Sequence, residues 1–166
     1  MKIVWQLLFL FVTTRATVAQ VTDYTLDQDP VFKTVLTRRL TYPNQASWSS
    51  MYARIFVGFS VDERGRVKQI SVLNHMSRGT RFGFEPAVIT ALKKLPSLNL
   101  RYAGNYLLPV AFIYVDYRHK DKPYVPKDTL YQQYVTDRIV LNEIKVFGNS
   151  VNSRERIRAA ARNEGY

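Results

Sequence analysis

The feature that most constrains this chain is a run of alternating side chains broken by one tight turn. The stretch "FSVDERGRVKQISV" extends from Phe59 to Val72. Apolar and small or polar residues alternate over Arg54–Val61, with Phe56 as the exception, and this period of two predicts a half-buried strand. Val67–Leu73 predicts the return strand. The chain is therefore expected to form an antiparallel hairpin here.

The turn between these strands has a structural explanation of its own. Asp62–Gly65 has the chemistry of a type I turn closed by a glycine with positive φ. Asp62 and Glu63 are adjacent carboxylates, but acid–base catalysis normally needs burial or a close charged partner to tune the pKa. We interpret both as turn residues rather than as a catalytic pair.

A helix and a third strand follow the hairpin. Apolar residues at helical spacing form one stripe over residues 84–95, and Pro96 ends the helix. Tyr106–Val115 is rich in β-branched and aromatic residues, and Pro109 within it lacks a backbone donor, which predicts a strand at a sheet edge. The order predicts an α+β fold, a small three-stranded antiparallel sheet (β-β-α-β) with one covering helix.

The N-terminus indicates export. Residues 1–19 have the layout of a secretory signal peptide: Lys2, a short apolar run, and Thr17-Val18-Ala19 before the expected cleavage point. The alternative is an uncleaved inner-membrane anchor, which Arg15 favours. We expect residues 20–38 to form a loose leader in the periplasm.

The net charge of the chain limits the classes of partner that we expect. The chain carries a formal net charge of +11 and no cysteine, which excludes disulfides and thiolate metal sites. A basic surface favours anionic neighbours. In an exported protein these are lipid head groups, cell-wall polymer or acidic protein loops, so we expect no nucleic-acid partner.

No arrangement of residues indicates catalysis. His75 and His119 are the two histidines and lie in separate segments, neither with a second ligand at metal-binding spacing. No nucleophile elbow, zinc-protease motif or phosphate-binding glycine loop is present. Aromatic richness is the one feature that fits a secreted hydrolase. We therefore expect no catalytic, cofactor or metal site, and not an enzyme.

Four segments in order resemble the C-terminal domain of TonB, the periplasmic energy transducer of Gram-negative bacteria. They are "YPNQA", "IFVGFSVDERGRVKQISVLN", "FEPAVITALKKLP" and "LPVAFIYV", within residues 42–115. They resemble the family's YPxxA opening, VxVxFxVDxxGxVxxVxVxxS hairpin, FDxxAxxAxKxxP helix and VPVxFxL last strand. The resemblance implies a protein-binding domain over residues 39–117.

The resemblance also implies a site and a partner. In this family the last strand pairs with an extended peptide, the TonB box, of an outer-membrane transporter, which is β-strand addition at an unpaired edge. Further partners to consider are an inner-membrane energising complex, peptidoglycan and a second copy in a homodimer. Carried over by position, the partner-binding residues are Arg39, Leu40, Thr41, Tyr42, Leu107, Leu108, Pro109, Val110, Ala111, Phe112, Ile113, Tyr114 and Val115.

Two departures from the family leave an alternative open. The family's transducers carry a stable N-terminal membrane helix, which here resembles a cleavable signal, and a long spacer that crosses the periplasm. About twenty residues at roughly 3.5 Å each would span on the order of 70 Å. The alternative is a soluble periplasmic scaffold or a cell-wall-associated binding module that uses its basic face.

The extension, residues 118–166, has no counterpart in the resemblance. Residues 118–128 are charged and carry two prolines, which predicts a linker, and Ser153 is expected to cap an Arg-rich helix over residues 154–162. The tail Ile139–Asn149, "IVLNEIKVFGN", resembles the box-like peptides of some transporters that read LxEVxVxG. If it acts as such a peptide, it pairs with the domain's own edge strand or with that of a neighbouring copy.

Overall fold

The computed structural model describes residues 25–75, 82–116, 118, 120 and 122–149. The expected signal peptide and the expected helix over residues 154–162 lie outside these residues. None of the helices within the described ranges is long and apolar enough to cross a membrane.

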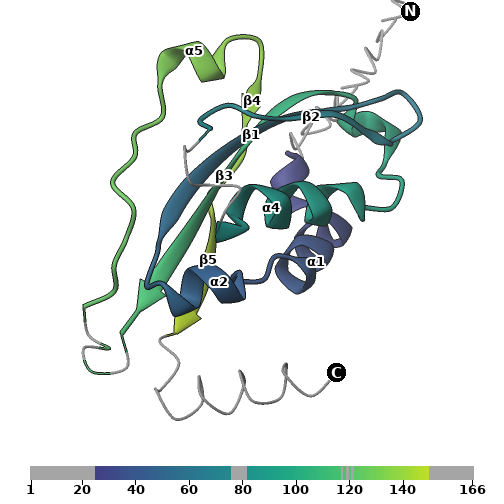
Figure 1. Cartoon of the computed structure of the whole chain (residues 1–166). Coiled ribbons are helices and arrows are strands. Elements are labelled where there is room, and N and C mark those ends of the chain that lie inside the picture. The colour runs from purple at the N-terminus through teal and green to yellow at the C-terminus, as the bar shows by residue number, and fades with distance from the viewer. Residues whose placement is uncertain (1–24, 76–81, 117, 119, 121, 150–166) are drawn as a thin grey trace, which may run out of the picture.

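The described residues form a mixed α+β fold in which helices lie against one face of a five-stranded sheet (Figure 1). The α-helices are α1 (Pro30–Arg39), α2 (Asn44–Trp48), α4 (Phe84–Lys93) and α5 (Gln132–Val135), and two short 3₁₀ helices are η1 (Leu26–Gln28) and η2 (Leu100–Tyr102). The strands are β1 (Ala53–Val61), β2 (Val67–Val72), β3 (Gly104–Val115), β4 (Ile139–Val140) and β5 (Ile144–Asn149).

The sheet contains the predicted strands and two more. β1 pairs antiparallel with β2 and with β3, as the sequence predicts. The short strands β4 and β5 both pair with β3, and both run parallel to it. The expectation of three antiparallel strands is therefore wrong, because the extension after residue 118 supplies a parallel side to the sheet.

The hairpin turn has the predicted geometry. Gly65 has a φ of 73°, in the left-handed region that favours glycine. Asp62 accepts hydrogen bonds from the backbone N–H groups of Arg64 and Arg66 at 2.9 and 2.8 Å. These contacts, led by the Arg66 N–H, lower the pKa of the Asp62 carboxyl below its usual value. The carboxylate organises the turn, as we expected.

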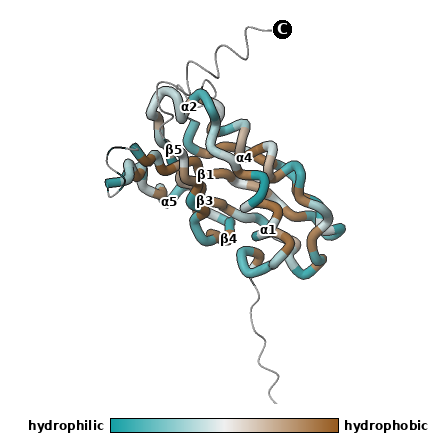
Figure 2. Tube along the Cα trace, turned by 90° about the horizontal axis from the view of Figure 1, so that it is seen from below, coloured by the Kyte–Doolittle hydropathy of each residue, from teal (hydrophilic) through white to brown (hydrophobic). Residues whose placement is uncertain are grey.

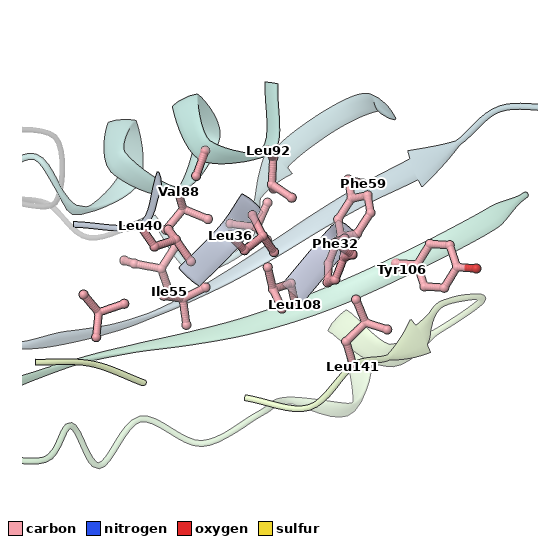
Figure 3. Packing of buried hydrophobic residues seen from close by; sticks show 14 of the residues in the cluster. Phe32, Leu36, Leu40, Ile55, Phe59, Val88, Leu92, Tyr106, Leu108 and Leu141 are labelled. Atoms are coloured by element: carbon pink, nitrogen blue, oxygen red, sulfur yellow. The ribbon is translucent and has the colours of Figure 1, made fainter. Parts of the chain in front are cut away.

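Two long helices, rather than one, cover the front face of the sheet. Val88 and Leu92 of α4 lie beside Leu36 of α1, and both helices face β1 and β3 (Figure 3). The expected stripe of α4 is confirmed, with Val88 and Leu92 fully buried. The leader expected over residues 20–38 is not loose where the structure describes it, because Leu26 and Leu36 are also fully buried.

Helix α1 has a clear local cause. The carboxylate of Asp29 accepts hydrogen bonds from the N–H groups of Val31 and Phe32, both at 2.9 Å, and so caps the helix. Pro30 fits the first helical position, where its missing N–H costs nothing. The cap and the burial of apolar side chains together hold this segment on the core.

The back face of the sheet is covered too. Phe56, the exception to the alternation, is 2 % exposed, and its ring lies 5.9 Å from that of Tyr134 in α5. Residues 122–138, the continuous described part of the connection from β3 to β4, run along this side of the molecule (Figure 1). Seen from below, hydrophobic residues gather along the central strands β1 and β3 (Figure 2). Phe56 is apolar because this segment covers it.

Candidate functional site

The expected binding edge, β3, is an interior strand of the sheet. It pairs with β1 on one side and with β4 and β5 on the other, so the prediction of an edge strand is wrong. The ladder on the second side is nevertheless interrupted. β4 pairs with Tyr106 and Leu107, β5 pairs with Val110 to Val115, and Pro109 lies in the gap between them. The missing donor of Pro109 falls where no strand needs it.

β5 occupies the side of β3 to which the family resemblance assigns a peptide. Its ladder with β3 pairs Val110 with Ile144 and continues to Val115 with Asn149. Val146 is buried at 8 % exposure, whereas Phe147 beside it is 60 % exposed. The alternation fixes the register of the strand, because a slip by one residue would exchange the two faces. Of the two pairings considered for the tail, the structure shows the one with the chain's own β3.

The residues just before β5 anchor the tail. The N–H of Leu141 donates to the carbonyl of Leu107 at 2.9 Å, and the Leu141 side chain is 3 % exposed. Figure 3 shows Leu141 below Leu108 and Tyr106, on the same cluster as the helices. Asn142 donates from its backbone to Asp27 at 3.2 Å. The tail thus contributes to the main hydrophobic core.

The second predicted segment, residues 39–42, lies against β5 rather than against β3 alone. Arg39 ends α1 and is exposed, and Leu40 is 6 % exposed in the core. Leu40, Thr41 and Tyr42 border a hollow of about 390 Å³, and β5 residues Ile144 to Phe147 form its other wall. The structure therefore brings residues 40–42 beside the strand on β3, as expected for a bound peptide, and the occupant is the chain's own tail.

Tyr42 is held in this site by contacts on several sides. Its hydroxyl donates to the carbonyl of Met51, and its ring makes edge contacts with Phe84 and Phe112 at 5.9 and 5.8 Å. Burial, and to a lesser degree Tyr114, raises the pKa of the Tyr42 hydroxyl well above its usual range. The face of the ring lies directly under Gly148 of β5.

Sequence reasoning missed two polar contacts of the tail. Arg54 Nε lies 2.7 Å from Glu143 Oε2, although the two atoms are not aligned for a hydrogen bond. Ser47 Oγ donates to the carbonyl of Asn149 at 2.6 Å. Arg54 is the one charged residue of β1, and this was the available signal, since a charged residue needs a partner when it is largely covered.

The remaining candidate groups do not converge on this site. His75 Nδ1 lies 3.2 Å from the buried Glu85, at the start of α4. Within the described ranges no three His, Cys, Asp or Glu side chains are close enough to hold a metal ion. The arrangement can bind the main chain of an extended segment through hydrogen bonds along β3, and polar side chains contact the two ends of that segment.

Comparison with known proteins finds no matching family model, no similar curated protein and no similar solved structure.

Proposed function

We propose that this protein is a periplasmic protein-binding domain of the TonB C-terminal type. It recognises an extended peptide, a TonB box, of an outer-membrane transporter and takes part in TonB-dependent transport. The recognition is strand addition along β3, in which main-chain hydrogen bonds give affinity and alternate side chains set register. The order of the four motifs in residues 42–115 supports the assignment to this class.

One observation carries the proposal. The edge of β3 accepts an extended, parallel segment of six residues, and residues 40–42 lie beside it. These are the residues to which the resemblance assigns the peptide site. A site that holds one extended segment by its main chain can hold another with suitable side chains.

The test is cross-linking between the full chain and a transporter. Because the chain has no cysteine, Thr41→Cys introduces a single thiol at the exposed wall of the hollow. We expect disulfides with a solubilised transporter that carries single cysteines at successive box positions, in a pattern that alternates with period two. Arg64→Cys, in the exposed hairpin turn, is the matched control. Equal cross-linking at both positions, or none at Thr41→Cys with the transporter in excess, would refute the proposal.

A second candidate function rests on a separate group of charges. Arg64 and Arg66 are exposed in the hairpin turn, and Lys93 and Lys94 are exposed at the end of α4. The hairpin turn and the end of α4 are neighbours: the N–H of Leu98, shortly after α4, donates to the carbonyl of Gly65 in the turn at 2.8 Å. Such a basic end fits a soluble scaffold or cell-wall-associated module. Retention on purified peptidoglycan that disappears at high salt would favour this function, whereas peptide binding that resists salt would favour the first.

A further inference from the structure

We infer that the site on β3 selects a particular class of extended peptide, of which residues Leu141–Asn149 of the tail are the resident example. The peptide lies parallel to β3, places a carboxylate beside Arg54, and places a glycine over the ring of Tyr42 five residues later. An incoming peptide of this class must displace the tail. The inference rests on the proposed function for the identity of the site, and it names the chemistry of the partner.

The glycine requirement follows from the packing at Gly148. A Cβ built on Gly148 would lie 2.5 Å from Cδ1 of Tyr42, which is closer than real Cβ contacts come. The ring has little freedom to move away, because Met51, Phe84 and Phe112 hold it on three sides. Any larger residue at this position would have to lift the strand from β3. The site therefore excludes side chains here by sterics.

The requirement for a carboxylate follows from Arg54. Its side chain is 20 % exposed, and its Nη1 donates to the carbonyl of Asp128. A largely covered guanidinium retains its charge and needs an anion nearby, which Glu143 supplies. Arg54 pairs in register with Ala111 on β3, and the small alanine side chain leaves room for Arg54 to cross the back face toward the tail. A peptide without an acidic residue at this position would leave Arg54 uncompensated.

Apolar positions complete the pattern. Leu141 and Val146 are buried in the main core, and Ile144 packs partly against it. Lys145, Phe147 and Asn149 are exposed, so their identity is free. The side-chain amide of Asn142 donates to the Asp27 carboxylate, so this position needs a hydrogen-bond donor. The selected pattern is apolar, donor, acidic, apolar, any, apolar, any, glycine.

The tail is tethered in a way that permits exchange. The segment that joins β3 to β4, residues 116–138, is nearly twice as long as β3 and carries one short helix among its described residues. Its length exceeds what is needed to return to the start of β3. The tail can leave the edge while β1, β2 and β3 remain paired, because its ladder involves β3 alone.

The test measures binding of a fluorescent peptide, LNEIKVFGN, to the full chain. In the native chain the tail competes, so we expect weak binding. Gly148→Val in the full chain introduces a clash with Tyr42 and weakens the binding of the tail to β3. We therefore expect the peptide to bind at least tenfold more tightly to this variant. Phe147→Val is the matched control, an exposed neighbour that we expect to leave the affinity unchanged.

Peptide variants test the selection rules on the Gly148→Val chain. Replacing the glycine of the peptide by valine, or its glutamate by lysine, should weaken binding at least tenfold, whereas replacing its phenylalanine by valine should not. The peptide with lysine in place of glutamate should regain affinity for a chain that also carries Arg54→Glu. If Gly148→Val fails to fold, Glu143→Lys weakens the same tail through Arg54. Equal binding of all peptides, or no gain in either tail variant, overturns the inference.

The two proposals fail separately. One outcome is that the peptides bind selectively while Thr41→Cys forms no cross-link to a transporter, either in the native chain or in the Gly148→Val chain. That result supports the inference and refutes the transporter as the partner. Cross-linking to a transporter, without selection for glycine or glutamate, supports the function and refutes the inference.

Discussion

At the scale of single residues, Gly65 shows how tightly the hairpin turn is built. Its φ of 73° is disfavoured for other residues, and an added Cβ would overlap the carbonyl group of Leu98, with the carbonyl carbon 2.9 Å away. We expect Gly65→Ala to lower the free energy of unfolding by about 1–3 kcal/mol, from backbone strain and the lost contact. Denaturant melts measure this. Arg64→Ala, one residue earlier and exposed, should change stability by less than about 0.5 kcal/mol. A similar small loss in both variants would contradict the role of Gly65.

Asp62 gives the same turn a dependence on pH. The N–H of Arg66, with that of Arg64, lowers the pKa of Asp62 in the folded chain. Its contribution to stability is therefore fully present above the usual pKa of aspartate and is lost as the pH falls through the lowered value. We expect Asp62→Ala to be less stable than the native chain at pH 7, and the difference to shrink in urea melts at acidic pH. Glu63→Ala serves as the control, and a difference that persists in acid would contradict this account.

At the scale of elements, the sequence predicted what its periodicity encodes. β1, β2 and α4 were predicted because their apolar residues repeat every two or every three to four positions. Helix α1 was missed because its buried residues, Phe32 and Leu36, stand among threonines and basic residues that weaken the stripe. The Asp29-Pro30 start signal was the one available cue. Pro109 led to the wrong prediction that β3 is an edge strand. A gap in the hydrogen-bond ladder between two neighbouring strands accommodates a proline as well as a sheet edge does.

The burial of α1 gives a direct test of this correction. Leu36→Ala should lower the free energy of unfolding by about 2–5 kcal/mol, the usual range for a core truncation, and Leu92→Ala in α4 should do the same. Lys33→Ala, on the exposed side of α1, should have little effect. A loss well below 1 kcal/mol for Leu36→Ala in denaturant melts would restore the interpretation of residues 30–38 as a loose leader.

At the scale of the whole molecule, the site combines segments far apart in the sequence, and this limited what could be predicted. Residues 40–42 and β3 were expected together because a family resemblance supplied their proximity. Arg54, Ser47 and Gly148 belong to the same site through contacts with the tail, and no periodicity within a segment encodes such contacts. The same limit applies to the back face, where Tyr134 covers Phe56 from the other end of the chain.

The expected signal peptide leads to a prediction about where the mature chain begins. The first described element begins at Leu26, so cleavage after Ala19 would leave every described contact intact. We expect the mature protein to begin at Gln20 and to be released from cells with the periplasmic fraction. The intact mass of the purified protein measures this. Recovery of the uncleaved chain from the inner membrane would contradict it and would favour the anchored alternative.

The parallel pairing of β5 with β3 has a consequence for how the molecule is made. β1, β2 and β3 precede the tail in the chain, so during synthesis the hairpin and β3 are complete before residues 139–149 appear. For that interval the nascent chain exposes a row of unsatisfied N–H and C=O groups, the kind of surface on which chains aggregate. Closing it requires the chain to cross the full length of the sheet, and non-local closure of this kind is slow. Residues 139–149 therefore close this side of the sheet late, and a chain cut short before residue 139 would keep the open side of β3 and would be prone to aggregation.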